Sequence, residues 1–533
     1  MGGLGVFEAA QRQENTQDRT RYSSKTSNFT VPFSFDITPN ILYNYFTMDI
    51  NEIVQQRIAK LEALGSKNVV LYPANVSAHI AIGEALSSFE EGKKVTLCGR
   101  VMANRAHGKV NFMDLRDTTG KIQLYIKRDI IGEEKAALLE QLDIADILCV
   151  SGELFKTHTQ EFTVKVQDFT VLAKALRPLP EKWHGLKDVE LRYRQRYLDL
   201  LSNEDVKKVF LLRTKIIQAI RSFLDARGFL EVETPMMHDI AGGAAGRPFK
   251  TFHNEYSMDL YLRIAPELYL KRLLVGGLDR VYEINRSFRN EGVSTRHNPE
   301  FTMLEVYQAY ADYEDMVNLT QDLICYVAKE VLGKEDLLYQ GKTINLKTPW
   351  NRQSFAGLVK DKFGIEPQDE ATVMLNKLQA KGLAKDKNRL SRSQINKIVE
   401  DALQQDLQTN PTFITDYFTS LCPLAKTKKD NPLLSERFEL YLAGMEIANA
   451  YSELNDPLEQ RRRFQEEIKD LNSEEQKNVD EEYLLALEHG MPPAGGLGIG
   501  IDRLVMLLTD QPSIRDVILF PLLRSQEQVE DKV

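Results

Sequence analysis

The sequence contains few cysteines, and none has the spacing of a metal-binding motif. Its four cysteines, Cys98, Cys149, Cys325 and Cys422, lie far apart with no Cys-x-x-Cys pair, which argues against both a zinc ribbon and a disulfide framework. The chain also lacks an apolar run of roughly 18 residues and a secretory signal at its start. We therefore expect a cytoplasmic protein without a membrane span.

Two common nucleotide-binding motifs are absent as well. No G-x-x-x-x-G-K-[ST] run occurs and no G-x-G-x-x-G opens a strand-helix-strand unit, which excludes P-loop and Rossmann sites. The net charge of −9, from 68 basic and 77 acidic residues, argues against a chain that binds nucleic acid along its whole length. With 43% apolar and 27% charged residues among 533, the composition is that of a globular protein with a large core.

The first part of the chain has little periodicity. Residues 1–47 are rich in Ser, Thr and Asn, so we expect a disordered or non-native extension, with Met48 as an alternative start. Four acidic residues in this stretch argue against a transit peptide. Residues 48–92 are expected to form a helical segment, because the apolar positions after Met48 have helical spacing up to Gly65.

Residues 93–177 have the pattern of a small barrel. Short alternating runs such as VTLCGRVM, KIQLYIK and FTVKVQDFTVL, broken by glycines, predict five or so strands closed into an OB-fold. Between Lys93 and Arg128, nine basic residues stand against two aspartates, an excess of seven. This local charge favours a nucleic-acid surface, with an ordinary solvated face as the alternative.

The remainder divides into a linker, a large domain and a tail. Residues 178–200 contain prolines and a basic run and are expected to be a linker. Residues 201–524 form the large domain, with a charged helical insertion at about 350–410, and residues 525–533 form the tail. Strand-like and helix-like patterns both occur, so the fold class is α+β.

The segment 280–313 concentrates polar groups on predicted strands. Alternation places Arg289 and Glu291 on one strand face, and a loop from Gly292 to Pro299 leads to a second strand that carries Glu305. A buried Glu305 needs a partner, either an internal ion pair or a cationic ligand. Arg296 and His297 in the loop add anion-binding groups beside Glu305, and this combination favours a bound ligand over an internal ion pair.

A second hairpin is predicted at residues 437–457. A two-residue turn at Ala443 and Gly444 places Tyr441 opposite Glu446, with Glu439 diagonal to Glu446 on the same face. Neighbouring carboxylates favour a divalent cation, and a solvated edge-strand pair is the alternative. A further set, Asn449, Tyr451 and Glu453, has the opposite parity, so both sets reach one pocket only if the strand bulges or twists.

A glycine-rich turn is predicted just before an apolar helix within residues 492–508. Glycines at positions 495, 496, 498 and 500 permit close backbone approach, and Asp502-Arg503 begins the helix. A guanidinium near a helix N-terminus favours an anion.

These segments resemble the three motifs of the class II aminoacyl-tRNA synthetases. GFLEVETP resembles motif 1, Phe288-Arg289-Asn290-Glu291 resembles the F-R-x-E of motif 2, and GIGIDR at 498–503 resembles motif 3. The barrel ahead of them is similar to that of the lysine, aspartate and asparagine subgroup. The strings YLRIAPELYLKRL, RHNPEFTMLEVYQAYADY and YSELNDP are similar to those of the bacterial lysine-specific members.

The resemblance implies a fold and a reaction. The fold is an N-terminal OB-fold barrel followed by a catalytic domain built on an antiparallel sheet flanked by helices. The implied reaction is that of a lysine-tRNA ligase: ATP activates L-lysine to lysyl-adenylate with release of pyrophosphate, and lysine then passes to the 3′-terminal adenosine of tRNA(Lys). Mg2+ is the implied cofactor, and a homodimer is the implied assembly.

The resemblance also implies roles for individual residues. Catalytic roles fall to Arg289 and Arg503. ATP-binding roles fall to Arg289, Glu291, His297, Asn298, Phe301, Glu439 and Arg503, with Glu439 and Glu446 as magnesium ligands. The lysine-binding set is Gly243, Glu267, Arg289, Glu305, Tyr307, Asn449, Tyr451 and Glu453. Phe112, Gln123 and Glu153 match the residues that read the anticodon, with a place in the barrel core as the alternative for Phe112.

Some positions depart from the family pattern. Ala450-Tyr451 stands where the family usually has Gly-Phe, and Met445 stands where it has an arginine. The sequence does not determine how these three residues change the affinity for lysine. Two other functions stay open beside the ligase. One is a related enzyme that attaches lysine to a translation factor and lacks the barrel. The other is a non-catalytic RNA-binding descendant, which the retained motif residues argue against.

Overall fold

The computed structural model describes residues 50–67, 69–180, 186–240, 242–244, 246–385, 387–404, 409–470 and 479–525. The extension expected at residues 1–47 lies outside these ranges, as does the expected tail beyond Ser525. The chain forms two units, residues 1–178 and 179–533. Across the described ranges, no helix is both long and apolar enough to cross a membrane.

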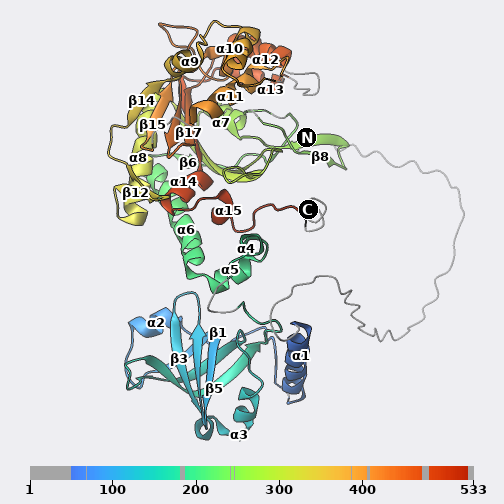
Figure 1. Cartoon of the computed structure of the whole chain (residues 1–533), viewed down its shortest axis with the longest axis vertical. Coiled ribbons are helices and arrows are strands. Elements are labelled where there is room, and N and C mark those ends of the chain that lie inside the picture. The colour runs from blue at the N-terminus through green and yellow to red at the C-terminus, as the bar shows by residue number, and fades with distance from the viewer. Residues whose placement is uncertain are drawn as a thin grey trace, which may run out of the picture. The chain divides into compact units, whose positions relative to one another are not determined.

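In its described residues, the first unit is a closed five-stranded barrel with three helices (Figure 1). Its elements are α1 (Ile50–Ser66), α2 (Ile82–Ser87), β1 (Lys94–His107), β2 (Val110–Arg116), β3 (Lys121–Lys127), α3 (Arg128–Leu139), β4 (Ile147–Lys156) and β5 (Phe162–Ala173). The strand order is β1-β2-β3-β5-β4, and apolar side chains that alternate along the strands fill the interior. The barrel predicted from alternation is therefore present.

The second unit is built on a sheet of eight strands. In sheet order these are β14 (Asn351–Ser354), β15 (Thr412–Thr415), β16 (Arg437–Leu442), β17 (Met445–Ser452), β18 (Ala494–Gly500), β11 (Glu300–Ala309), β10 (Arg280–Phe288) and β6 (Leu230–Glu231). Neighbours pair antiparallel except at the two edges, where β14 pairs parallel with β15 and β6 with β10. Smaller sheets are formed by β7 (Met237–His238), β8 (Lys250–His253) and β9 (Met258–Leu262), and by β12 (Asp336–Tyr339) and β13 (Lys342–Asn345).

Helices precede this sheet and pack around it. They are α4 (Val189–Arg194), α5 (Arg196–Ser202), α6 (Glu204–Asp225), α7 (Glu267–Val275), α8 (Tyr313–Leu332), α9 (Phe355–Phe363), α10 (Ala371–Ala380), α11 (Arg392–Gln404), α12 (Pro457–Asp470), α13 (Glu481–Glu488), α14 (Ile501–Leu508) and α15 (Ile514–Val517), with a 3-10 turn at Thr419–Leu421. The stretch expected as a linker thus contains α4 and the start of α5, while α9 to α11 occupy the expected insertion.

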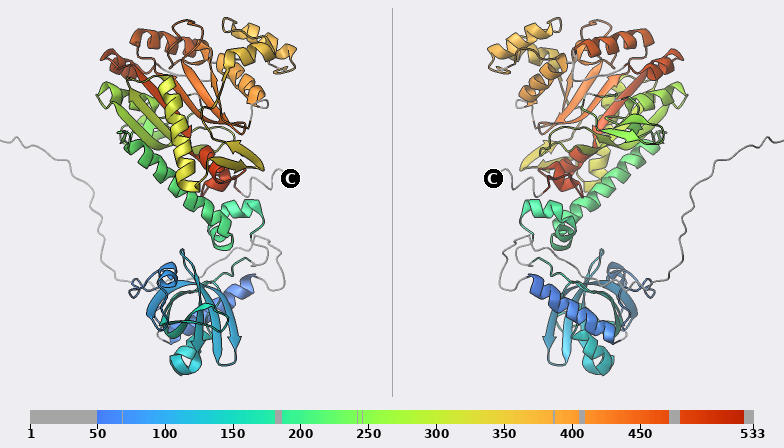
Figure 2. Two further views of the ribbon diagram at one scale, coloured as in Figure 1. Left: turned by 90° about the vertical axis from the view of Figure 1, so that its left-hand side faces the viewer. Right: turned by 90° about the vertical axis from the view of Figure 1, so that its right-hand side faces the viewer.

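One face of the sheet is apolar and the other carries the polar groups. Leu304 and Val306 of β11 belong to a buried cluster that α6, α8 and α14 share. Figure 2 shows α6 and α8 running together beside the sheet, where they pack against each other. Glu305 and Tyr307 point to the opposite face, as period-two alternation requires. The helix predicted from the spacing of apolar residues at 206–224 is α6, and it ends before Gly228, whose φ is +75°.

Two sequence expectations differ from the structure, and the first concerns the end of β10. The strand ends at Phe288, so Arg289 lies one residue beyond it and Glu291 lies in the loop. The reason is that the strand pairing stops where the chain must turn toward Pro299, whose carbonyl accepts a hydrogen bond from Arg289 N at 2.8 Å.

The second difference is that the glycines at 495–500 form the central strand β18, not a turn. Their small size is used for close packing within the sheet. A Cβ at Gly495 would stand 2.8 Å from the Asp312 carbonyl oxygen, and a Cβ at Gly496 would stand 1.9 Å from Oε1 of Glu453. The strand therefore has room for its neighbours only without side chains at these positions.

Candidate active site

The end of β10 presents a guanidinium to the polar face of the sheet. The Arg289 guanidinium lies 5.2 Å from the centre of the Phe301 ring, which β11 holds beside it. Its Nε is buried and has no hydrogen-bond partner in the described part of the chain. Burial lowers the pKa of Arg289, although an arginine stays charged at neutral pH. A buried donor without a protein partner is a suitable contact for an anion.

A second guanidinium lies at the start of α14. Arg503 Nη1 donates to the backbone oxygen of Glu446 at 2.6 Å and contacts Glu446 Oε2 at 3.2 Å. Its Nη2 lies 3.1 Å from Nε2 of His297. Because a guanidinium can only donate, His297 accepts through Nε2 and its Nδ1 donates to Ser294 Oγ at 3.0 Å. Burial, and then Arg503, lower the pKa of His297, so the imidazole is neutral.

The β16–β17 hairpin has the predicted turn and also a bulge. Tyr441 pairs with Glu446 across Ala443 and Gly444 as predicted, but Leu440 pairs with Ala448 and Glu439 with Asn449. Ile447 is therefore an extra residue on β17, a β-bulge. The bulge brings Glu446 and Asn449 to the face that Glu439 occupies, which meets the condition for one pocket. Ile447 and Ala448, neighbours in the sequence, both join the apolar cluster.

Glu439 is the centre of a buried network. Arg437 pairs with its carboxylate, and the hydroxyl groups of Tyr417 and Tyr441 donate to its Oε2 at 2.7 Å each. Burial raises the pKa of Glu439, and Arg437 opposes that rise. The guanidinium of Arg437 in turn lies 4.4 Å from the Tyr417 ring centre. Glu439 is thus held in one orientation.

Hard oxygen donors gather near this network, and they suit a magnesium ion. Glu439 and Glu446 share one face of the hairpin, and Glu446 lies close enough to contribute to the raised pKa of Glu439. In the described ranges, no group of three or more His, Cys, Asp or Glu side chains is arranged to hold a metal by itself. Two carboxylates fit an ion that takes its remaining oxygens from phosphates and water, as Mg2+ does.

The other end of the polar face is rich in carboxylates. Glu267 at the start of α7, Glu305 on β11 and Glu453 after β17 are each 6% exposed or less. The Tyr307 hydroxyl donates to Glu305 Oε2 at 3.2 Å. Burial, and then Glu267, raise the pKa of Glu305 to about 8. Gly243 borders this group, since a Cβ at Gly243 would stand 3.5 Å from the Glu267 side chain.

The remaining predicted residues belong to the same region. Asn298 is buried, and its Nδ2 donates to the Glu300 carbonyl oxygen at 2.6 Å while its Oδ1 has no partner among the described residues. Glu291 is exposed in the loop after Arg289. Tyr451 is half-buried, 5.5 Å from the Arg437 guanidinium. A cationic end and a carboxylate end thus lie on one sheet face.

Several supporting residues were missed by the sequence prediction. Arg213 of α6 donates to Asp502 Oδ1 at 2.6 Å and to Thr302 Oγ1 at 3.0 Å, and Asp502 Oδ2 accepts from Thr302 N at 2.7 Å. These hydrogen bonds fix the start of α14, where Arg503 follows. No local pattern joins residues so far apart in the sequence. Arg437 was detectable, because it is two residues from Glu439 and so shares its strand face.

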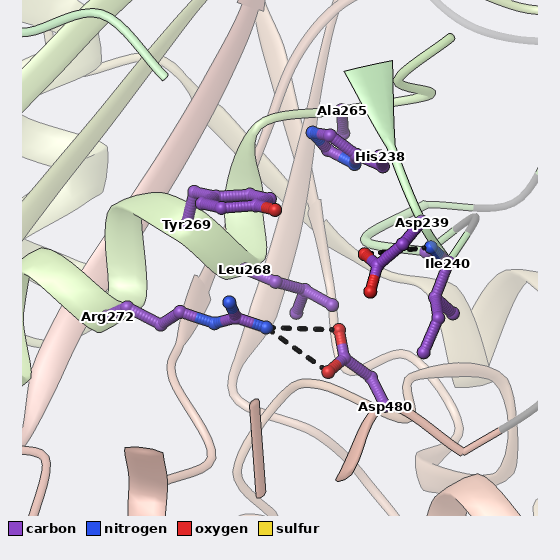
Figure 3. A pocket seen from close by; sticks show the side chains of 9 residues that line it. His238, Asp239, Ile240, Ala265, Leu268, Tyr269, Arg272 and Asp480 are labelled. Atoms are coloured by element: carbon purple, nitrogen blue, oxygen red, sulfur yellow. Dashed lines mark hydrogen bonds and ion pairs between the residues drawn. The ribbon is translucent and has the colours of Figure 1, made fainter. Parts of the chain in front are cut away.

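A small cavity of about 10 Å3 lies beside α7 and is lined by none of the predicted side chains. Figure 3 shows Arg272 of α7 reaching toward Asp480, with Tyr269 and His238 above them. The Arg272 Nη2 to Asp480 Oδ1 distance is 3.2 Å. This ion pair joins α7 to the residue that precedes α13.

The barrel carries a larger cavity. It measures about 660 Å3 and is lined by Phe112, Tyr125, Glu153 and Phe155 among others. Phe112 and Tyr125 are edge-to-face neighbours at 5.4 Å, and Tyr125 and Phe155 at 5.9 Å. Phe112 is not part of the barrel's buried apolar cluster.

The third predicted barrel residue, Gln123, is buried on β3. Its side chain donates to Glu161 at 3.1 Å and accepts from Thr163 at 3.2 Å. Part of the basic excess of the barrel is neutralised locally, since Arg105 and Lys121 both pair with Asp114. Aromatic rings beside basic groups form a surface that suits stacked bases.

An OB-fold barrel, together with a mostly antiparallel sheet whose polar face is bordered by Arg289 after β10 and by Arg503 of α14, is the arrangement of a class II tRNA synthetase. The family described as tRNA synthetases class II (D, K and N) matches residues 188–524, and the OB-fold nucleic acid binding domain matches residues 95–172.

Curated relatives identify the branch of this class. The lysine–tRNA ligase of Carboxydothermus hydrogenoformans is 53% identical over 485 residues, which cover 90% of this chain and 99% of that protein. That of Moorella thermoacetica is 52% identical over 90% of this chain and 99% of its own length. That of Clostridium novyi is 48% identical over 89% and 95%. The chain therefore belongs to the lysine–tRNA ligase family of class II.

Proposed function

We propose that the chain charges tRNA(Lys) with L-lysine at the expense of ATP. The observation that carries the proposal is the division of one sheet face into a cationic end, with Arg289 and Arg503, and a carboxylate end, with Glu305. Triphosphate and substrate carboxylate are anionic, and the two ammonium groups of lysine are cationic. An aspartate substrate would instead need a cation where Glu305 lies.

In the first step, the lysine carboxylate attacks the α-phosphorus of ATP, lysyl-adenylate forms and pyrophosphate leaves. Arg289 holds the α-phosphate and the substrate carboxylate, and Arg503 holds the γ-phosphate, so both stabilise charge that develops on phosphate oxygens. Phe301 stacks on the adenine, and Glu291, His297 and Asn298 contact the nucleotide.

Glu439 and Glu446 would hold magnesium, which neutralises phosphate charge when it is bound. Arg437 and two tyrosines keep Glu439 oriented for this role. Glu446 also stays within reach of Arg503.

Lysine lies between the carboxylates at the other end of the face. Glu267 and Gly243 contact the α-ammonium side, while Glu305 and Glu453 contact the side-chain ammonium. The lysine-binding set is completed by Tyr307, Asn449 and Tyr451, which provide walls for the methylene chain.

In the second step, the 3′-hydroxyl of the terminal adenosine attacks the lysyl carbonyl carbon and AMP leaves. The barrel reads the anticodon with Phe112, Gln123 and Glu153. The presence of the barrel also argues against an enzyme that modifies a translation factor, because the related enzymes of that kind lack a barrel.

Cytoplasmic location and a homodimer complete the proposal. Support for a dimer comes from exposed apolar side chains near the motif 1 segment at the edge of the sheet. Leu230, Met236 and Met237 are 52%, 49% and 54% exposed. Sedimentation of the purified protein tests the assembly, and a monomer at micromolar concentration would contradict it.

The test of the activity is lysine-dependent exchange of pyrophosphate into ATP, followed by charging of tRNA(Lys). We expect exchange with L-lysine and none with L-aspartate. Arg289→Ala should abolish exchange, whereas Arg286→Ala, which removes a half-exposed guanidinium from β10, should keep it. Exchange without an amino acid, or with aspartate in preference, would refute the assignment.

A further inference from the structure

A buried lysine of the protein itself stands among the pocket carboxylates. Lys271 of α7 has no exposed side-chain area. Its Nζ donates to Glu267 Oε1 at 2.6 Å and also pairs with Glu453. Glu267 precedes Lys271 by four residues, so one turn of α7 places both on the same helix face. Lys271 thus connects the carboxylates assigned to the two ends of the substrate.

Lys271 is the chief support of Glu453. Apart from this ion pair, neither oxygen of the Glu453 carboxylate has a hydrogen-bond partner among the described residues. Glu453 has no freedom to move toward β18 either, because its Oε1 fills the space that a Cβ of Gly496 would need. A buried carboxylate held by one cation is strongly destabilised when that cation is removed.

The charges of the pocket can be compared with those of the proposed substrate. Glu267, Glu305 and Glu453 contribute three negative charges when ionised, and Lys271 contributes one positive charge, which leaves two negative charges. Glu305 forms no salt bridge within the described ranges and receives only the Tyr307 hydroxyl. L-Lysine carries two ammonium groups, while its carboxylate belongs to Arg289. The number of free negative charges equals the number of ammonium groups.

We propose that Lys271 is a positioning residue that sets the charge of the amino-acid pocket to match a diammonium substrate and fixes the orientation of Glu267 and Glu453. The proposal rests on the proposed lysine-activating function. Without Lys271, two carboxylates lose their common partner, and one of them takes up a proton or turns away. Either change removes a contact to the substrate.

The ionisation of the Lys271–Glu453 pair supports this assignment. Burial lowers the pKa of Lys271, but the carboxylates of Glu267 and Glu453 raise it well above its usual value, so Lys271 is an ammonium. Burial raises the pKa of Glu453, and Lys271 opposes this rise. The direct contact of Lys271 with the Glu453 carboxylate favours the ionised form of Glu453, because a proton there would remove a partner of a buried ammonium.

The other groups around the pair do not replace Lys271. The ionisable side chains that face it are Tyr483 from α13, Tyr307 from β11, Tyr451 from β17 and Lys426. Among these four, only Lys426 is a cation, and within the described residues it forms no ion pair with Glu453, whereas Lys271 does. Tyr483 is buried, and its hydroxyl has no partner in the described part of the chain.

The test is Lys271→Met, which keeps an unbranched side chain and removes the charge. We expect the KM for lysine in pyrophosphate exchange to rise by about tenfold or more, with the KM for ATP within about twofold of the unchanged protein. Lys271→Arg, which keeps the cation, should recover part of the lysine affinity. The matched control is Arg272→Met on the next residue of α7, whose guanidinium points to Asp480 (Figure 3) and whose loss should leave the lysine KM within about twofold.

The outcomes separate the inference from the function on which it rests. If the unchanged protein shows no lysine-dependent exchange, the proposed function fails. If it shows exchange and Lys271→Met keeps its lysine KM, or weakens ATP and lysine equally, the inference fails.

A measurement on the unchanged protein covers the case in which Lys271→Met does not fold. Titration calorimetry of lysine at pH 7 in buffers of different ionisation enthalpy counts the protons released. Release of about one proton, from Glu305, is expected, because Lys271 already holds Glu453 ionised. Release of two protons would overturn the inference, since Glu453 would then have been protonated and unpaired.

Discussion

At the scale of single residues, the pocket combines buried carboxylates with very few protein cations. Glu305 shows the consequence most clearly. Burial on the polar face of β11, and the nearby Glu267, raise its pKa to about 8, while the Tyr307 hydroxyl lowers it. In the free protein at neutral pH the group is therefore largely a neutral acid. An incoming ammonium stabilises the carboxylate and expels the proton.

This titration predicts how lysine binding depends on pH. Below pH 8 the proton on Glu305 competes with the substrate ammonium, so the KM for lysine should fall as pH rises from 6 to 8, by up to about tenfold per unit, and then level off. The side-chain ammonium of lysine remains charged through this range, because its pKa is about 10.4. Pyrophosphate exchange measured at a series of pH values gives the profile.

Glu305→Gln provides the control, because an amide cannot titrate. Its lysine KM should be high and nearly independent of pH between about 6 and 8. A lysine KM of the unchanged protein that rises with pH over this range would contradict the assignment of Glu305.

The stability of the fold follows the same linkage. The pKa of Glu305 is higher in the folded state than in the unfolded state, so ionisation of Glu305 destabilises the fold. The contribution of Glu305 to folding therefore declines as pH rises from about 4.5 to about 8.

At the scale of elements, the glycine strand β18 determines how closely a protein carboxylate of the lysine pocket, that of Glu453, can pack against the sheet. Gly496 pairs with Tyr307 of β11 and Tyr451 of β17. A Cβ there would stand 1.9 Å from Glu453 Oε1 and 2.6 Å from a ring carbon of Tyr307. A Cβ at Gly498 would only approach Asn449 Oδ1 and the end of the Met303 side chain, each at 3.3 Å.

Gly496→Ala should therefore weaken lysine binding far more than Gly498→Ala. We expect the first substitution to raise the lysine KM by about tenfold or more and to destabilise the fold by about 1–3 kcal/mol, because overpacking displaces Glu453. The second should change the lysine KM by only a few-fold, because a methionine side chain can move aside. Exchange kinetics and thermal unfolding of the two variants measure the difference, and equal effects would contradict it.

The elements differ in how well the sequence predicted them. The hairpin turn at Ala443 and Gly444 was predicted, because a two-residue turn fixes the register of the residues beside it. The bulge at Ile447 could only be stated as a condition, since it depends on pairing with β16. Lys271 was not predicted, because only the folded sheet brings Glu453 to α7. The strand prediction at Arg289 was wrong, because period-two alternation continued past the point where pairing ends.

At the scale of the whole molecule, the two units differ in chemistry. The barrel carries an aromatic cavity near basic side chains, while the larger unit carries the sheet face with the proposed chemistry. The net charge of −9 is an average over both and hides the basic excess between Lys93 and Arg128. In the proposed function, pyrophosphate exchange needs only the site of the larger unit, whereas charging of tRNA needs both units.

Phe112→Ala should therefore affect charging and leave exchange unchanged. Loss of one stacked base costs about 1–3 kcal/mol, so the KM for tRNA should rise by about 5-fold to 150-fold. Phe162→Ala is the matched control, because Phe162 is 37% exposed on the barrel but packs on Phe89 and does not line the cavity. Aminoacylation assays with both variants make the comparison. A normal tRNA KM for Phe112→Ala would remove Phe112 from the reading surface.

The bulge at Ile447 divides β17 into two segments, one on each side of the register shift with β16. In the proposed function, Glu446, before the bulge, would hold the magnesium of the nucleotide, whereas Asn449, Tyr451 and Glu453, after it, would contact the amino acid. If these roles hold, substitutions in the later segment should alter the amino-acid contacts and leave the proposed magnesium ligand in place. The departures at Ala450 and Tyr451 fall in this later segment. A single inserted residue thus separates the proposed magnesium ligand of the strand from its proposed lysine contacts by a break in the pairing with β16.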